Sequence, residues 1–210
     1  MQESCRLRDL EIERLEARLG ILTDAQQACD ARTRATTGPV LETTDSQLHG
    51  LLGVVSSLVR VPRGLERAIE AALAENLQAM LLERQKDALA AIQDLARQEL
   101  GRVVIFPLDT LKEVYPLNIM KEHGVVGVAS RLVRCDDRYR KVVDTLLGRT
   151  IVVDDLDIAL RVLRRGMGSV VTRDGILLHP LGSISTGRPT SEGNIFARQQ
   201  ELASIPRAIE

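Results

Sequence analysis

The chain has 210 residues, of which 44% are apolar and 27% are charged, the balance typical of a globular protein with one or two domains. Lys and Arg number 28 against 29 Asp and Glu, so no overall charge points to nucleic acid or a membrane as partner. Two Tyr, two Phe and no Trp argue against a protein that stacks bases on aromatic rings. No apolar run reaches the roughly 18 residues of a membrane span, and no signal peptide opens the sequence.

The N-terminal segment, residues 1–35, predicts a coiled-coil arm. Its apolar seam repeats with steps of three and four residues and consists of Ile12, Leu15, Leu19 and Leu22, extended more weakly by Gln26 and Cys29. A single amphipathic helix packed on the globular part remains an alternative. The Thr-rich stretch Thr33–Ser46 contains Gly38-Pro39 and predicts the loop between arm and globule.

Residues 46–111 predict a first α/β unit. The expected order is strand, helix, strand, helix, strand: the motif "HGLLGVVSSLVR" at His49–Arg60, an amphipathic helix after Pro62, a strand at Leu77–Leu82, a helix at Arg84–Glu99 and a strand at Gly101–Phe106. That order favours some parallel strand pairing. Residues 112–123 follow as a connector.

Residues 124–192 predict a second copy of the same unit. "HGVVGVASRLVR" at His123–Arg134 repeats the first motif seventy-four residues later with eight of twelve positions identical. Its further elements are a helix starting near Asp136, a strand at Thr150–Val153, a helix at Leu156–Arg165 and a strand at Gly168–Arg173.

The second unit then adds elements that the first lacks. Asp174-Gly175 between two apolar runs predicts a two-residue hairpin and an antiparallel strand at Ile176–His179. A glycine-spaced tail and a charged helical segment, residues 193–210, complete the chain. The expected fold class is therefore mixed α/β (α+β), two similar half-domains from an internal duplication, flanked by antiparallel coiled-coil helices.

No motif in the sequence predicts catalysis or a cofactor. No G-x-x-x-x-G-K-[ST] loop occurs, and no nucleophile has a recognisable partner. Asp154, Asp155 and Asp157 lie where a helix begins, so we interpret them as capping residues and expect no metal. The three cysteines, Cys5, Cys29 and Cys135, are far apart and form no C-x-x-C pair, which predicts a reducing cytoplasmic setting.

This order of elements resembles the hinge domain of SMC proteins, the chromosome-organising ATPases, of the bacterial chromosome-condensation type. "GVVGVASRLVRCDDRYRKVVDTLLGRTIVVDDLDIA" at Gly124–Ala159 and "LGRVVIFPLD" at Leu100–Asp109 are similar to motifs of the two family half-domains. The family tail is glycine, six residues, glycine, three residues and two glycines. Here Gly175, Gly182 and Thr186-Gly187 keep that spacing, with Thr186 in place of one glycine.

The resemblance implies a homodimerisation device without an activity of its own. The first half of one chain would meet the second half of the other, twice, and arms would lead to ATPase heads that this sequence does not contain. The expected interface residues are Gly175, Gly182, Thr186 and Gly187, since glycines let two backbones approach closely. Alternatively, Gly175 serves only its hairpin, and Gly182 and Gly187 serve only loop turns. A nucleoid-associated cytoplasmic protein without a membrane or small-molecule partner follows.

A weak DNA contact is a further expectation. Between Gly127 and Gly166 nine Lys or Arg stand against six Asp, a net charge of +3. Arg134, Arg138 and Lys141 are the candidates for phosphate contacts without sequence preference. An ordinary solvated helix face is the alternative.

A second class of function stays open at this level. Duplicated α/β halves can also enclose a cleft for a small molecule or a substrate. A constitutive dimer favours the hinge, whereas a monomer with an apolar pocket favours the enzyme or small-molecule binder.

Overall fold

The computed structural model describes residues 50–97, 103–120 and 122–186, together with positions 14, 18, 20, 23 and 196. The predicted seam residues Ile12, Leu15, Leu19 and Leu22, the loop Thr33–Ser46, Gly187 and most of the returning segment lie outside these residues. Within the described part of the chain, no helix has the length and apolar character needed to cross a membrane.

The first half is a three-stranded sheet with helices on both faces. Its elements are β1 (Leu51–Val54), α2 (Val55–Leu58), α3 (Glu66–Leu73), the 3-10 turn η1 (Ala74–Gln78), β2 (Met80–Leu82), α4 (Gln85–Arg97), β3 (Ile105–Pro107) and η2 (Leu108–Thr110). The strand order is β1-β2-β3, with β1 antiparallel and β3 parallel to β2.

The second half repeats this unit and extends it. Its elements are β4 (Val125–Val128), α5 (Ala129–Leu132), η3 (Asp137–Tyr139), α6 (Arg140–Leu147), β5 (Thr150–Val153), α7 (Leu156–Leu163), β6 (Ser169–Thr172), β7 (Ile176–Leu178) and β8 (Ile184–Thr186). The five strands lie in the order β4-β5-β6-β7-β8; β5 and β6 are parallel, and the other neighbours are antiparallel. The predicted mixed α/β class with duplicated half-domains and the predicted parallel pairing are confirmed, whereas the pairing of the predicted flanking helices lies outside the described residues.

The duplication extends to backbone irregularities. The register of β1 on β2 shifts between Leu51 and Gly53, and that of β4 on β5 shifts between Val125 and Gly127, seventy-four residues later. Both glycines have positive φ, 139° and 151°. Each motif therefore contains the same bulged strand, which bends into a four-residue helix instead of continuing as strand.

Arg60 and Arg134 mark a local two-fold relation between the halves. The Arg60 N–H donates to the Arg134 carbonyl at 2.8 Å, and the Arg134 N–H donates to the Arg60 carbonyl at 2.9 Å. The two residues occupy equivalent positions of the repeat. When two equivalent residues form an antiparallel bridge with each other, a local two-fold axis passes between them. The halves therefore face each other about an axis through this bridge.

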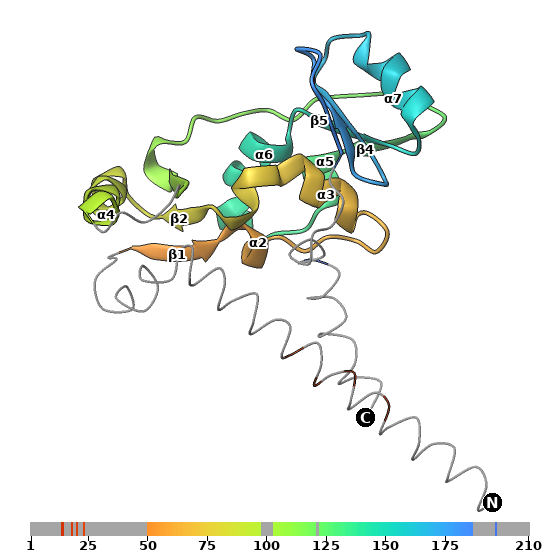
Figure 1. Cartoon of the computed structure of the whole chain (residues 1–210). Helices are drawn as coiled ribbons and strands as arrows, with labels where there is room; N and C mark the ends of the chain where they lie inside the picture. Colours follow the sequence, from red (N-terminus) through yellow and green to blue (C-terminus); the bar gives the residue numbers. More distant parts are fainter. Residues whose placement is uncertain are drawn as a thin grey trace, which may run out of the picture.

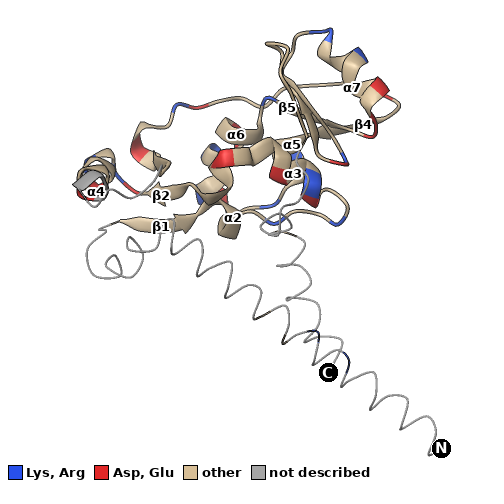
Figure 2. Ribbon diagram, viewed as in Figure 1, with Lys and Arg blue, Asp and Glu red and all other residues tan. Residues whose placement is uncertain are grey.

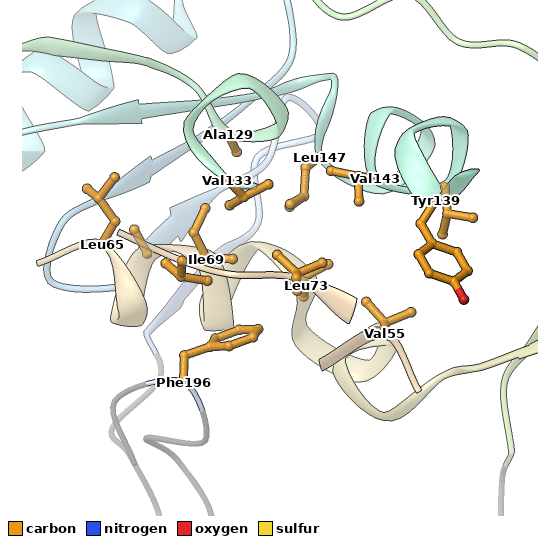
Figure 3. Packing of buried hydrophobic residues seen from close by; sticks show 14 of the residues in the cluster. Val55, Leu65, Ile69, Leu73, Ala129, Val133, Tyr139, Val143, Leu147 and Phe196 are labelled. Atoms are coloured by element: carbon orange, nitrogen blue, oxygen red, sulfur yellow. The ribbon is translucent and has the colours of Figure 1, made fainter. Parts of the chain in front are cut away.

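One apolar core is shared across that axis. It contains equivalent buried side chains from both halves, among them Val59 and Val133, Ile69 and Val143, and Leu73 and Leu147. Figure 3 shows α3 side chains facing those of the second half, while Phe196 approaches α3 from the other side. Since each buried aliphatic side chain contributes about 1.5–3 kcal/mol, this core binds the two halves into one globule.

The two sheets enclose the shared core, and each carries one helix on its outer face. Outer clusters form between α4 and the first sheet and between α7 and the second. In Figure 1 the order of layers is accordingly α4, first sheet, the central helices, second sheet and α7. Leu81 and Val171 point to the shared core, whereas Met80 and Val170 point to the outer helices, as the alternation along a strand requires.

Two elements differ from the sequence expectations. The predicted strand at Leu77–Leu82 starts only at Met80, because Ala74–Gln78 form a 3-10 turn. The predicted two-residue hairpin has a three-residue connection, residues 173–175, closed by the Gly175 N–H donating to the Thr172 carbonyl at 2.9 Å. The Thr172 hydroxyl also accepts from the Ile176 N–H at 3.1 Å, which explains the longer turn.

Candidate interaction edge and basic groove

Strand β8 is one of the two edge strands of the five-stranded sheet, and it is exposed. It pairs with β7 through Leu178 and Ile184, Leu177 and Ser185, and Ile176 and Thr186. All three β8 residues are exposed, and the side chain of Ile184 is 65% accessible. Within the described residues its other edge is unpaired. An apolar, open strand edge is a template for pairing with another chain.

The β7–β8 turn determines which backbone groups point outward. The His179 N–H donates to the Ser183 carbonyl and the Gly182 N–H to the His179 carbonyl, both at 2.9 Å. Hydrogen-bonded and non-hydrogen-bonded pairs alternate along an antiparallel ladder. The N–H and C=O of Ser185 therefore point to β7, and those of Ile184 and Thr186 point to the open edge.

The predicted interface glycines occupy different places. Gly182 and Thr186 lie on the exposed side, and Gly182 has φ +93° with no atom within 4 Å of an added Cβ. Gly175 is buried inside the chain, where a Cβ would lie 3.1 Å from the carbonyl oxygen of Arg67 in α3. Gly175 therefore joins the β6–β7 turn to the first half of its own chain.

Strand β3 is the corresponding open edge of the three-stranded sheet. It is hydrogen-bonded on one side, to β2, among the described residues. The Met80 N–H donates to the Val104 carbonyl at 2.9 Å, so Val104 points to β2 and the backbone groups of Ile105 point away from it. In the second half the equivalent edge, that of β6, is covered by β7. The first half has no counterpart of β7 or β8 among its described elements.

A groove of about 720 Å³ lies between the halves, beside the local two-fold axis. Its lining includes the equivalent residues Arg60 and Arg134, together with Ser57, Cys135 and Tyr139. Both arginines are exposed, and neither pairs with a carboxylate of the described residues. The groove therefore presents two guanidinium groups to solvent.

The predicted DNA-contact residues are all exposed, but their surroundings differ. Arg134 lines the groove, with Arg60 as a neighbour that sequence reasoning missed. Arg138 lies over the Tyr139 ring at 4.6 Å and 3.7 Å from Asp136, so part of its charge is compensated. Lys141 lies in the first turn of α6. Basic and acidic positions are interspersed along the ribbon in Figure 2.

The titratable groups near these sites have structural roles. Burial raises the pKa of the Cys135 thiol, an effect that the nearby Arg140 guanidinium reduces. The bidentate pair of Arg165 with Glu122, at 2.6 and 2.9 Å, lowers the pKa of that carboxyl and joins the connector to the turn after α7. Of the three predicted capping residues, Asp155 accepts from the Ile158 N–H at 2.9 Å and caps α7, whereas Asp154 forms an ion pair with Arg173 at 2.6 Å. No group of three potential metal ligands occurs within the described ranges.

Comparison with known proteins assigns the fold to a family. The SMC proteins Flexible Hinge Domain matches residues 48–163, more than half of the chain. The chain belongs to this family. The matched region ends with α7, so β6, β7 and β8 of this SMC hinge lie beyond it.

Relatives and solved structures agree with the SMC hinge assignment. The chromosome partition protein Smc of Fusobacterium nucleatum is 32% identical over 177 residues, 81% of this chain and 15% of the relative. That of Lactiplantibacillus plantarum is 33% identical over 164 residues, 75% of this chain and 14% of the relative. The chain thus spans about one seventh of these proteins.

Two solved hinges share the fold. The crystal structure of an asymmetric dimer of the Geobacillus stearothermophilus SMC hinge domain matches with a TM-score of 0.73 and 28% identity, over 98% of this chain and 90% of that one. The Pyrococcus furiosus SMC hinge domain matches with a TM-score of 0.61 and 26% identity, over 80% and 87%.

Proposed function

We propose that this chain is the homodimerisation hinge of a chromosome-condensation protein of SMC type, and that β8 of each copy pairs with the first half of the other. The observation that carries the proposal is the exposed, unpaired β8 edge with Ile184 on it. The dimeric Geobacillus stearothermophilus hinge and the relatives named chromosome partition protein support it.

The duplication indicates where β8 would bind. Strand β3 is equivalent to β6, and the position beside it, occupied in the second half by β7, is free in the described part of the first half. A strand from another chain placed there would extend the three-stranded sheet as β7 extends its counterpart. It would also pair the outward backbone groups of Ile105, which a dry interface requires.

This arrangement closes upon itself. Each chain has one donor edge, β8, and one acceptor edge, β3. Two copies related by a two-fold axis therefore make two identical junctions, in which the β8 and β3 edges of both copies are occupied.

The remaining parts of the chain complete the proposed hinge. Residues 46–111 and 124–192 are the half-domains, 112–123 is the connector, and 1–35 and 193–210 are arm segments that pair within one chain. In the whole protein these arms would lead to the ATPase heads, and the dimer would close a ring around chromosomal DNA in the cytoplasm.

Two substitutions at the tail test the dimer. Gly182→Asp combined with Gly187→Asp places carboxylates in the proposed junction and should give folded monomers, as measured by light scattering and circular dichroism. Asp174→Glu, a change at an exposed position in the β6–β7 turn, serves as the control and should stay dimeric. A folded double variant with the mass of a dimer would exclude the tail from the interface.

A weak, sequence-independent contact with DNA is the second part of the proposal. Arg134 in the groove, with Arg138 in η3 and Lys141 in α6, offers positive charge from each copy, and Arg60 adds to it. Such side chains bind phosphates. The logarithm of the binding constant therefore falls with the logarithm of the salt concentration, with a slope of about −0.9 per phosphate contacted on duplex DNA.

Charge reversal tests this contact. Arg134→Glu, Arg138→Glu and Lys141→Glu together should abolish gel-shift binding at about 50 mM salt while the dimer persists. The control reverses three exposed charges, those of Lys86 in α4, Arg161 in α7 and Arg164 directly after α7, and should retain more binding. Equal loss in both variants would indicate an effect of net charge alone, and no binding by the wild type would remove DNA from the proposal.

The cleft that the enzyme alternative requires exists as the groove between the halves. Among the described residues, its lining offers no nucleophile paired with a base and no group of metal ligands, so the observations favour the hinge.

A further inference from the structure

Helices α4 and α7 cover equivalent faces of the two sheets, but α4 lies over fewer strands than α7. Helix α7 contacts β5, β6 and β7, whereas α4 contacts β2 and β3. The part of α4 that corresponds to the contact with β7 therefore faces the free position beside β3.

Ile92 is the α4 residue that shows this difference. Leu51 pairs with Leu82 and its repeat equivalent Val125 pairs with Val153, so Leu82 and Val153 are equivalent strand ends. Counting ten residues onward from each makes Ile92 of α4 equivalent to Leu163 of α7. The burial of both helices supports the alignment, since Ala88 and Ala91 are buried like their counterparts Ala159 and Val162.

The two aligned residues differ in their surroundings. Leu163 packs against the outer cluster of the second half. Ile92 is 47% exposed. An apolar side chain that is covered in one copy of the repeat is thus left uncovered in the other, on the side where a strand is missing.

Strand β8 carries a matching side chain on the matching face. Ile184 is opposite Leu178, which belongs to the outer cluster under α7, and directly opposite residues point to the same face of a sheet. Ile105 of β3 likewise points to the outer cluster under α4. Both Ile184 and Ile105 also direct their backbone groups to the open edges.

The side-chain faces and backbone directions of Ile184 and Ile105 distinguish an antiparallel from a parallel junction. In an antiparallel junction, residues with outward backbone groups lie directly opposite each other, so Ile184 lies beside Ile105 of the partner subunit, on the α4 face. In a parallel junction, Ile184 is opposite Val104 of the partner subunit and points to the shared core side. Ile184 would then lie on the face opposite to α4, and Ile92 could not contact it.

We propose, building on the dimer proposed above, that the junction is antiparallel and that α4 is part of it, with Ile92 of each copy covering Ile184 of the other. The occupant of the free α4 surface is thus a second copy of this chain. Helix packing then adds to strand pairing in setting which copies associate.

Crosslinking tests the direction of pairing. In a background with Cys5, Cys29 and Cys135 replaced by Ser, Ile92→Cys with Ile184→Cys should be joined between chains by a short bis-maleimide. Ile92→Cys with Ser185→Cys should not, because Ser185 is opposite Leu177, a residue that packs on the shared core. Crosslinking through position 185 and not 184, in a dimer, would overturn the antiparallel junction. A monomeric protein by light scattering would instead overturn the dimer itself.

Charge substitution tests the contribution of α4. Ile92→Asp should raise the dissociation constant of the dimer about 30-fold, which corresponds to ~2 kcal/mol over two junctions. Leu89→Asp is the matched control: Leu89 is 53% exposed on the same helix, and its counterpart Leu160 is 40% exposed although α7 contacts β7. An equal effect of both substitutions, or none of Ile92→Asp in a folded dimer, would exclude α4 from the junction.

Discussion

Gly175 and Gly182 form a natural pair for separating internal packing from the interface. Both have positive φ, +88° and +93°. An added Cβ at Gly175 would meet the Arg67 carbonyl oxygen at 3.1 Å and the Arg67 Cβ at 3.6 Å, whereas at Gly182 it would meet open space. Replacing each glycine by Ala therefore applies the same backbone strain with and without a steric contact.

The expected magnitudes differ accordingly. The left-handed conformation costs a residue with a Cβ about 1–2 kcal/mol, which is the whole cost of Gly182→Ala within one chain. Gly175→Ala adds roughly 1–3 kcal/mol because α3 or the turn must shift. The free energy of unfolding should thus fall by about 2–5 kcal/mol for Gly175→Ala.

Urea unfolding followed by circular dichroism, at one protein concentration for both variants, measures these losses. Sedimentation gives the dimer dissociation constants in parallel, and we expect Gly182→Ala to weaken the dimer and Gly175→Ala to leave it nearly unchanged. Equal losses of unfolding free energy would refute the contact with Arg67, and a dimer weakened mainly by Gly175→Ala would refute its internal role.

Three further variants address other features of the fold. Ala74 ends α3 with a strained backbone, φ 44°, so Ala74→Gly should increase the free energy of unfolding by about 1 kcal/mol. A lower free energy of unfolding in urea would contradict backbone strain at Ala74. Phe196 is 1% exposed and its N–H donates to Glu70, so Phe196→Ala should cost about 3–5 kcal/mol, and a cost near that of a surface change would contradict its burial. Burial raises the pKa of Cys135, so with Cys5 and Cys29 replaced by Ser its alkylation should be slower than that of glutathione at pH 7.5 and accelerate only at higher pH; equal rates would contradict this.

The sequence was sufficient for the order of elements because two independent signals agreed. The twelve-residue repeat and the helical spacing around Ile69 and Val143 have the same offset, and the structure places both residues in one shared core. Capping residues such as Asp155 were recognisable because a cap depends only on local backbone geometry.

Features that depend on contacts between residues far apart in the sequence were not predicted. Strand β8 has only three residues, too few for periodicity, and its assignment depends on β7 beside it. The bridge between Arg60 and Arg134 and the packing of Phe196 on α3 join residues far apart in the chain, and no local pattern encodes them. The location of Gly175 was open for the same reason, since the carbonyl it approaches belongs to Arg67.

The central claim is that copies of this chain associate through the β8 edge. Its most direct test is the molar mass by light scattering over a range of concentrations, for the wild type, for Thr186→Pro and for Thr186→Ala. Proline puts a ring in place of a backbone N–H that points to the open edge and not to β7, so we expect dimers for the wild type and Thr186→Ala, and folded monomers for Thr186→Pro. A monomeric wild type, or a folded Thr186→Pro variant as tightly dimeric as Thr186→Ala, would contradict the account.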